Sequence, residues 1–294
     1  MKTHNTHRAM MYCALRAVVG VLMIGSASAV NYTWNKVTGT YTDAANWGPA
    51  GGPPTSADRA YISNGGTATL AAGATGAGNL VLISGASSLT VSGGNLTSQT
   101  VQLGAANDAT TGTMNISSGS VTTSTYVQVG QYAVDTGIVN MSGGTLAATT
   151  NGFVGDAGNG QFNLTGGNAT FGVYMYVGSA ATGTGTLSIS AGSLTTGNSG
   201  VRVGSLGNGT VNVSDSGTLK AGPTGTAVII VANSAGSTGT LNVGIGGTAG
   251  TVTAAEVFGG SGTATVKFNH TGALSFAPLL KGSLSVTKSG AGTT

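Results

Sequence analysis

The chain has 294 residues, of which 40% are hydrophobic and only 6% are charged, whereas globular proteins usually have roughly 25% charged residues. Glycine is abundant, with 53 residues against 5 prolines, but it keeps no three-residue period, which excludes a collagen triple helix. Intrinsic disorder is also excluded, because disordered chains combine low hydrophobicity with high net charge and the mean hydropathy here is +0.23. The composition therefore requires a packed protein with polar but uncharged surfaces.

The N-terminal segment 1–29 has the organisation of a secretory signal peptide. Basic residues are followed by an apolar run over 17–25, and the small residues Ala27 and Ala29 form an A-x-A cleavage site. The apolar run is too short to cross a bilayer as a helix. We therefore expect cleavage after Ala29, export to the extracellular space or the cell surface, and no transmembrane segment in the mature chain.

Cleavage would change the charge of the protein. Three of the ten basic residues and the only cysteine, Cys13, lie in the signal, so the mature chain has seven basic and seven acidic residues. The pI of 9.1 is thus largely a property of the signal, and it does not indicate nucleic acid or an anionic membrane as a partner. Without cysteine, the mature chain cannot be stabilised by disulfides.

The next segment, 30–70, differs from the rest of the chain and contains both tryptophans and three of the five prolines. We expect it to cap a stack of repeats, because an open stack of strands exposes edges and core at its ends. An alternative is that Trp34 and Trp47 form a platform on which sugar rings stack. Asp58 and Arg59 are expected to make a local polar contact.

A repeat organises residues 71–268. It begins as GTMNISSGSV at Gly112 and recurs about every 24 residues. A second short motif, VQLG at Val101, alternates with it as VQVG, GFVG, MYVG and VRVG. Later copies of the first motif begin at Gly137, Gly160, Gly185, Gly209, Gly239 and Gly262.

Both motifs alternate apolar and polar residues, which is the pattern of a strand with one buried face, and the flanking Gly, Ser and Asn residues form turns. One unit buries almost nothing alone, whereas stacked units would join their apolar positions into one core. The sequence therefore predicts an all-β fold, a single-stranded β-solenoid or parallel β-helix with coils of about 24 residues. A transmembrane barrel needs longer strands and more aromatic residues, and propeller blades need longer repeats. The predicted core column comprises Met114, Met141, Leu164, Ile189, Val213 and Val243.

One polar residue recurs at an equivalent position in each repeat. Stacked amides can hydrogen-bond along a ladder of parallel strands, so a structural role is expected, with a ligand-binding stripe as the alternative. Several of these asparagines lie in N-x-S/T strings, which we interpret as by-products of the repeat. The ladder comprises Asn115, Asn140, Asn163, Asn212 and Asn242, with Ser188 replacing asparagine once.

The mature chain has few groups suited to catalysis. It has no cysteine and a single histidine, His270, which we expect at the surface, so nucleophilic catalysis and zinc binding are unsupported and no cofactor is expected. Glycoside hydrolysis needs two carboxylates at a fixed separation, and Asp108, Asp135 and Asp156 fall in successive coils but in loops of different length. These three aspartates are also weak candidates for calcium. Arg202 is expected to point outward, between Tyr176 and Ile230 in the neighbouring coils, with no carboxylate in its column.

The final segment, 269–294, ends in SVTKSGAGTT, where Val286, Thr287, Lys288, Gly290, Gly292 and Thr293 match a known pattern. This pattern resembles the autotransporter-associated β-strand repeat, an apolar residue followed by T-K-x-G-x-G-T and another strand. Residues 43–47 (DAANW) and 54–58 are similar to the opening of such exported bacterial proteins. The resemblance implies a passenger-like β-helix at the cell surface, and the missing last strand suggests truncation.

From these observations we expect a non-enzymatic extracellular or surface-exposed β-solenoid with a structural or adhesive role. Its partners would be glycans or other cell-surface and matrix polymers. One alternative is a carbohydrate-active β-helix, a polysaccharide lyase or hydrolase. Another is a carbohydrate-binding module that uses the cap residues Trp34 and Trp47 or the outward aromatic residues Phe153 and Tyr176.

Overall fold

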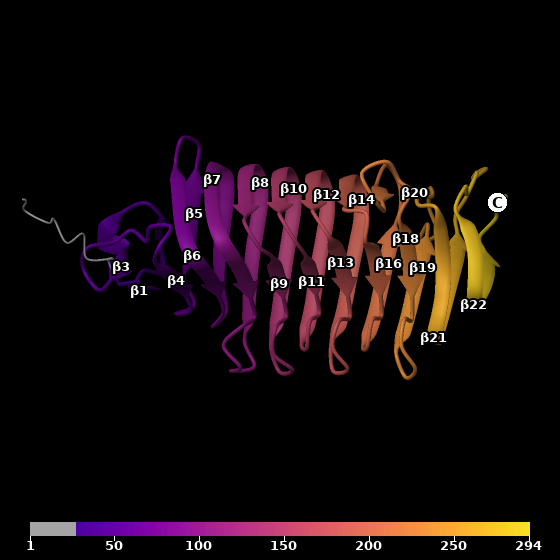
Figure 1. Cartoon of the computed structure of the whole chain (residues 1–294). Coiled ribbons are helices and arrows are strands. Elements are labelled where there is room, and N and C mark those ends of the chain that lie inside the picture. Colours follow the sequence, from indigo (N-terminus) through magenta and orange to yellow (C-terminus); the bar gives the residue numbers. More distant parts are fainter. Residues whose placement is uncertain (1–27) are drawn as a thin grey trace, which may run out of the picture.

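A computed structural model describes residues 28–294 of the protein, so the predicted signal peptide lies almost entirely outside the described residues. The described chain is a β-solenoid of about 10 turns, with coils about 25 residues apart and 61% of the residues in strands. The coils stack side by side into a rod with the cap at one end and the C-terminus at the other (Figure 1). The predicted all-β solenoid is therefore confirmed.

The rod begins with short strands that already follow the solenoid pattern. Strand β1 pairs in parallel with β4, and β4 pairs in parallel with β6, so segment 30–70 is hydrogen-bonded into the same ladder as the repeats. Within the described chain, no helix is long and apolar enough to cross a membrane. The first elements are β1 (Asn31–Trp34), β2 (Thr38–Thr40), the 3-10 helix η1 (Ala44–Asn46), β3 (Trp47–Gly48), β4 (Arg59–Ile62), β5 (Thr67–Ala71) and β6 (Thr75–Ile83).

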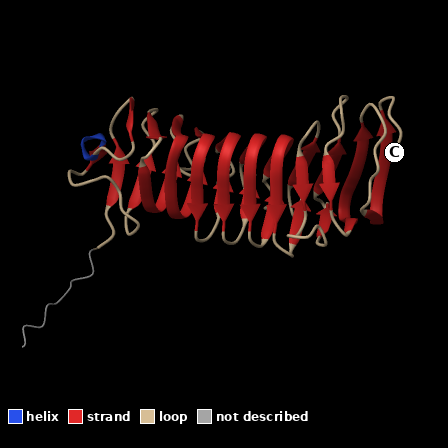
Figure 2. Ribbon diagram, turned by 90° about the horizontal axis from the view of Figure 1, so that it is seen from above, coloured by secondary structure: helices blue, strands red, loops and turns tan. Residues whose placement is uncertain are grey.

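Each central coil has three faces. A long strand covers the first face, bends at a Gly-rich corner, and continues over the second face, while a short strand forms the third face (Figures 1 and 2). The long strands are β7 (Ser87–Leu103), β8 (Thr111–Thr123), β10 (Thr136–Ala148), β12 (Asn159–Phe171) and β14 (Thr184–Thr196). The short strands are β9 (Val127–Val129), β11 (Gly152–Val154), β13 (Tyr174–Val177), β15 (Gly200–Val203) and β18 (Val228–Val231).

The later coils keep these faces but divide them differently. The first face is continued by β16 and β19, and the second by β17 and β20, before β21 joins the third face to the first. Strand β22 pairs in parallel with β21 and is exposed along nearly its whole length. These strands are β16 (Asn208–Val213), β17 (Thr218–Lys220), β19 (Thr238–Val243), β20 (Thr251–Thr253), β21 (Glu256–Asn269) and β22 (Leu279–Ser289).

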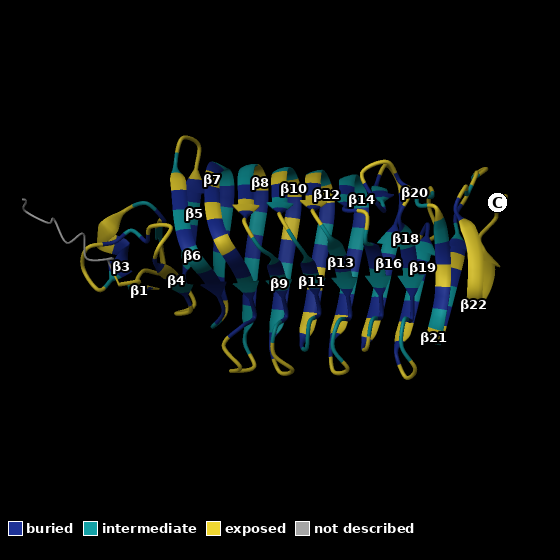
Figure 3. Ribbon diagram, viewed as in Figure 1, coloured by how far each residue is buried: buried dark blue, intermediate teal, exposed yellow. Residues whose placement is uncertain are grey.

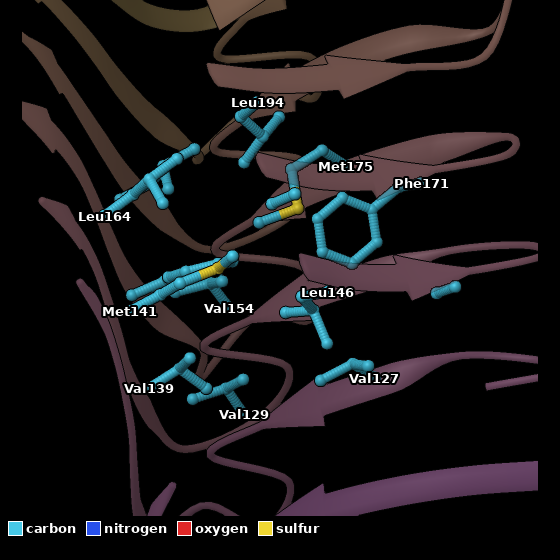
Figure 4. Packing of buried hydrophobic residues seen from close by; sticks show 14 of the residues in the cluster. Val127, Val129, Val139, Met141, Leu146, Val154, Leu164, Phe171, Met175 and Leu194 are labelled. Carbon is cyan, nitrogen blue, oxygen red and sulfur yellow. The ribbon is translucent and has the colours of Figure 1, made fainter. Parts of the chain in front are cut away.

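The core follows from the alternation along each strand. On the first face, inward residues are buried and outward residues are not, which appears as bands along the strands in Figure 3. The inward side chains of successive coils meet in the interior (Figure 4). One core column comprises Val91, Ile116, Met141, Leu164, Ile189, Val213, Val243 and Phe268.

The observed register corrects one member of the predicted column. Met114 pairs with Leu89 and Val139, not with Met141, whose partner in that coil is Ile116. Both Met114 and Ile116 point inward, so alternation alone could not distinguish them. The sequence had placed the correct face inward but had shifted one coil by two residues.

The corner that follows the third face needs a left-handed backbone. The last residue of the VxVG motif has a φ of +72° at Gly130 and +68° at Gly155, where a residue with a β-carbon would be strained. In a later coil Ala232 occupies this corner with a φ of +52°. The glycine of the second motif therefore reflects a turn that is repeated in each coil.

The N-terminal cap has its own aromatic cluster. Trp34 and Tyr41 both pack edge-on against Trp47, with ring centroids 5.1 Å and 4.9 Å apart. The indole N–H of Trp47 donates to the carbonyl of Tyr41 at 2.7 Å. Because Trp34 and Trp47 are only 1% and 2% exposed, neither can present a ring face to a sugar. The expectation of a tryptophan sugar platform is wrong: these residues close the end of the core.

A buried carboxylate fixes the beginning of the cap. Asp58 accepts hydrogen bonds from the backbone N–H groups of Val30 and Thr55, both at 2.9 Å, and from the hydroxyl of Thr55 at 2.6 Å. Burial acts to raise the pKa of Asp58, but these hydrogen bonds outweigh it and lower the pKa below its ordinary value. The contact joins the first residues of the described chain to the loop before β4.

Candidate functional site

Asp135 has a structural role in the loop of the preceding coil. Its side chain is fully buried. One carboxylate oxygen accepts from the N–H of Asn107 at 2.7 Å, and the other accepts from the N–H groups of Asp108 and Ala109 at 3.1 Å and 3.0 Å. These bonds hold Asn107 and Ala109 in left-handed backbone conformations, each with a φ of +57°. The carboxylate of Asp135 is therefore occupied by backbone donors of a neighbouring coil.

The other two predicted aspartates are also engaged locally. Asp108 accepts hydrogen bonds from the backbone and the hydroxyl of Thr110, and Asp156 accepts from the side chain of Gln128. Among residues 28–294, no three His, Cys, Asp or Glu side chains are grouped so that they could hold a metal ion. Asp108, Asp135 and Asp156 therefore do not form such a metal-binding group, and the carboxylate of each has its own hydrogen-bonding partners.

The sequence predicted that His270 lies at the surface, but this prediction is wrong. It is fully buried near the C-terminal end of the solenoid, and its Nε2 atom lies 2.8 Å from the hydroxyl of Thr294. Phe268, two residues earlier, packs edge-on against Phe276 with ring centroids 5.0 Å apart. His270 is thus part of the packing at this end of the rod.

The outward column of the third face is rich in aromatic and amide side chains. Phe153 and Tyr176 stack on each other in adjacent coils, with ring centroids 5.1 Å apart and ring planes only 5° apart. Tyr126 packs edge-on against Phe153. The stacked contact covers one face of each ring, and both side chains are half-buried. Phe153 and Tyr176 therefore form an outward aromatic ladder on the third face, and their role in sugar binding stays a prediction.

Arg202 continues this column, between Tyr176 and Ile230 as the alternation predicted. Its guanidinium lies over the ring of Tyr174, 5.0 Å from the centroid, and donates to Asn233 Oδ1 at 2.9 Å. The hydrogen bond from Arg202 is the main reason that the pKa of Tyr174 is lowered from its ordinary value. These contacts join three coils of the third face.

The predicted asparagine column forms a hydrogen-bonded ladder on the first face. Asn140 donates to Asn115 Oδ1 at 3.0 Å, and Asn163 donates to Asn140 Oδ1 at 2.9 Å. Further along, Asn212 donates to Ser188 Oγ at 3.1 Å, and Asn242 donates to Asn212 Oδ1 at 2.7 Å. Each bond has the same direction, from one coil to the preceding coil. The ladder thus orients the amides along the rod.

A shallow groove of about 210 Å³ runs beside this ladder. Its two walls are the asparagines and the hydroxyl residues that lie two positions later, at the corner between the first and second faces. The buried residues Ile116 and Met141 lie between the walls. The lining consists of Thr90, Asn115, Ile116, Ser117, Asn140, Met141, Ser142, Asn163 and Thr165.

No protein-family model, curated protein or solved structure matches this chain. The groove is the candidate site because it is a hollow lined by ordered amide and hydroxyl groups from successive coils. Its two walls coincide with the strings Asn115–Ser117, Asn140–Ser142 and Asn163–Thr165. The recurring N-x-S/T strings indicate that the asparagines and the hydroxyl residues share one side of the strand, because residues at i and i+2 of a strand lie on one side. The interpretation of these strings as by-products of the repeat gave the hydroxyl residues no role.

Replacing Asn140 with alanine should destabilise the protein by about 1 kcal/mol. The change removes two ladder hydrogen bonds, and each such bond contributes a net amount of about 1 kcal/mol, less where water can replace it. Urea unfolding followed by circular dichroism measures the difference. Asn168→Ala is the matched control, since Asn168 is an exposed outward residue of the second face. Equal effects of the two changes would show that the ladder adds no stability.

Replacing Arg202 with glutamine should raise the pKa of Tyr174 toward its ordinary value of about 10. The guanidinium stabilises the tyrosinate by hydrogen bonding, and a neutral amide stabilises it less. Absorbance of tyrosinate during an alkaline titration reports the change. Because its pKa is lowered, Tyr174 should ionise at a lower pH than an ordinary tyrosine and give an early step in the titration. In Tyr174→Phe this early step should be absent, whether or not Arg202 is present. An early step that survives Tyr174→Phe would contradict the assignment.

Proposed function

We propose that this protein is an exported, non-enzymatic β-solenoid with a structural or adhesive role at the cell surface. The observation that supports this best is the ladder of uncharged side chains that continues along the first face over several coils. Such a repeated surface suits contact with another extended polymer better than it suits the conversion of one small molecule. The passenger-like character rests on the resemblance of the terminal segments described above.

The distribution of charge agrees with a role that does not depend on charged partners. Charges are few, and the described residues contain a single ion pair, Lys281 with Glu256 at 2.6 Å. Surface pairs of this kind contribute little to stability. A neutral rod would approach uncharged polymers without the salt dependence that is typical of nucleic-acid binding. Glycans and matrix polymers are therefore the proposed partners.

A non-enzymatic role is proposed because the candidate acids have other duties. Asp135 is buried and saturated by backbone donors, and Asp156 accepts from Gln128. A glycoside hydrolase needs two carboxylates that face one substrate. A panel of glycans incubated with the protein should release neither reducing nor unsaturated sugars. Turnover that is abolished by changing Asp108, Asp135 and Asp156 together would overturn this part of the proposal.

The localisation can be tested in intact cells that express the full chain. We expect the N-terminus of the mature protein to begin at Val30, and we expect added protease to degrade the protein while cytosolic markers stay intact. A variant without residues 2–29 is the matched control and should remain protected. A full-length chain that keeps its first residues and stays protected would contradict export.

A further inference from the structure

The polar groups of the first-face groove are held in place by hydrogen bonds that do not use all of their donors and acceptors. A side-chain amide has two N–H donors and an oxygen with two lone pairs. In the ladder, Asn140 uses one donor toward Asn115 and accepts one bond from Asn163. One N–H and one lone pair of each inner amide therefore stay free for a ligand.

The ladder also fixes the orientation of these free groups. An amide that flipped would place its oxygen against the oxygen of the preceding coil, and both ladder bonds would be lost. The free donors and acceptors thus recur in one direction at the strand spacing of roughly 4.8 Å. Because the amides are ordered before any ligand arrives, binding would cost less side-chain entropy than binding to mobile side chains.

The opposite wall adds hydroxyl groups without competing bonds of their own. Ser117 and Ser142 are exposed, and no side-chain hydrogen bond of either is present in the described structure. Thr165 makes only a long contact, 3.4 Å, to the carbonyl of Met141. A ligand between the walls would therefore contact amides on one side and hydroxyls on the other. Below it would lie the backbone of the buried residues Ile116 and Met141.

The charge and size of the groove define the class of ligand. No titratable side chain lines it, so it offers nothing to offset the desolvation of an anionic or cationic ligand. Its volume of about 210 Å³ is below the roughly 300–1,000 Å³ usual for small-molecule pockets. A short ligand would gain little there, whereas a linear ligand could repeat the same contacts over successive coils.

We propose that the groove between the asparagine ladder and the residues Ser117, Ser142 and Thr165 binds a linear, uncharged polysaccharide whose chain runs along the rod. Sugar hydroxyls would accept from and donate to the free amide groups, and their neutrality matches that of the groove. This inference rests on the proposed function, since it names the partner of an adhesive or matrix protein. It assigns to the ladder a binding role in addition to its structural one.

Chromatography of the mature protein on columns that carry an immobilised glycan tests the inference. The probes are hydroxyethyl cellulose, galactomannan and neutral xylan, with polygalacturonate as the anionic comparison. At least one neutral glycan should retard the protein equally at low and high salt, and polygalacturonate should not. Ser142→Tyr would fill the groove while keeping every ladder residue, and it should weaken retardation roughly ten-fold or more.

Thr145→Tyr is the matched control, because Thr145 is an exposed residue of the same strand, β10, outside the groove. It should leave the retardation unchanged, and urea unfolding checks that both variants fold. Ser142→Ala, which removes only a hydroxyl, should produce a smaller loss in the same direction. Absence of retardation by all neutral glycans, or equal retardation of Ser142→Tyr and Thr145→Tyr, would overturn the inference. Neither result would alter the protease-accessibility outcome, which tests the proposed localisation separately.

Discussion

The variant Gly160→Ala should lose about 3 kcal/mol of unfolding free energy, the largest effect that we expect from adding one methyl group to this protein. Gly160 is the second residue of β12, the first-face strand of its coil, and pairs with Gly137 and Gly185 in the adjacent coils. A β-carbon at this position would lie closer than 3.0 Å to the backbone of Gly155, Val154 and Val129. Backbone atoms cannot rotate away as a flexible side chain can, so the coil itself would have to shift.

The loss would extend beyond one residue because of the architecture. Each coil of a solenoid contacts only its neighbours, and the whole stack is stable through these interfaces. Overpacking a well-packed interior typically costs 1–3 kcal/mol, occasionally more, and here it would disturb the interfaces on both sides of β12. Urea unfolding followed by circular dichroism should show a lower midpoint and, if the array separates, a second transition.

Two other glycines separate the causes. Gly247 is exposed, and an added β-carbon would have only Asp215 nearby, at 3.7 Å, so Gly247→Ala should change stability by less than about 0.5 kcal/mol. Gly73 has open space but a φ of +80°, so Gly73→Ala should cost about 1 kcal/mol through backbone strain alone. A cost at Gly160 no greater than that at Gly73 would contradict the close approach of the coils.

The second large effect is expected for Asp135→Ala, which should lower stability by about 3 kcal/mol. The substitution removes three charge-assisted hydrogen bonds to the N–H groups of Asn107, Asp108 and Ala109. Hydrogen bonds to charged groups contribute roughly 1.5–3 kcal/mol each, although the freed loop can regain part of this from water. Two of the three residues have a φ of +57°, and such strain persists only where surrounding contacts enforce it.

Amide hydrogen exchange would locate this loss. We expect the segment 104–110 to exchange much faster in Asp135→Ala, while the core strands β10 and β12 keep most of their protection. Asp108→Ala is the matched control, because the side chain of Asp108 is exposed and bonds only to Thr110 in its own loop, while its backbone N–H toward Asp135 is kept. If both variants lost the same stability, or if exchange of 104–110 did not change, Asp135 would not hold the loop.

Several features of this protein were determined by its sequence alone. Alternation of apolar and polar residues determined which side chains face the core, because successive residues of a strand point to opposite sides. The recurrence of two motifs in phase predicted stacked coils, and it placed Asn115, Asn140 and Asn163 at equivalent positions, where the structure has them paired. The outward position of Arg202 between Tyr176 and Ile230 also followed from the alternation.

The tertiary structure decided matters that depend on neighbouring coils. Met114 and Ile116 have the same inward direction, so only the observed pairing shows which of them contacts Met141. The stacking of Phe153 on Tyr176 depends on side-chain rotation, which a strand pattern does not specify.

Burial of polar and aromatic residues outside the two repeated motifs was likewise decided by the tertiary structure. Asp135 and His270 are buried because the loops and chain ends of other coils cover them, and Trp34 and Trp47 are buried because the cap folds over the open end of the core. Sequence periodicity describes one coil at a time and contains no information about such coverage. The repeat therefore determined the fold and its faces, and contacts between coils determined which side chains remain free to bind.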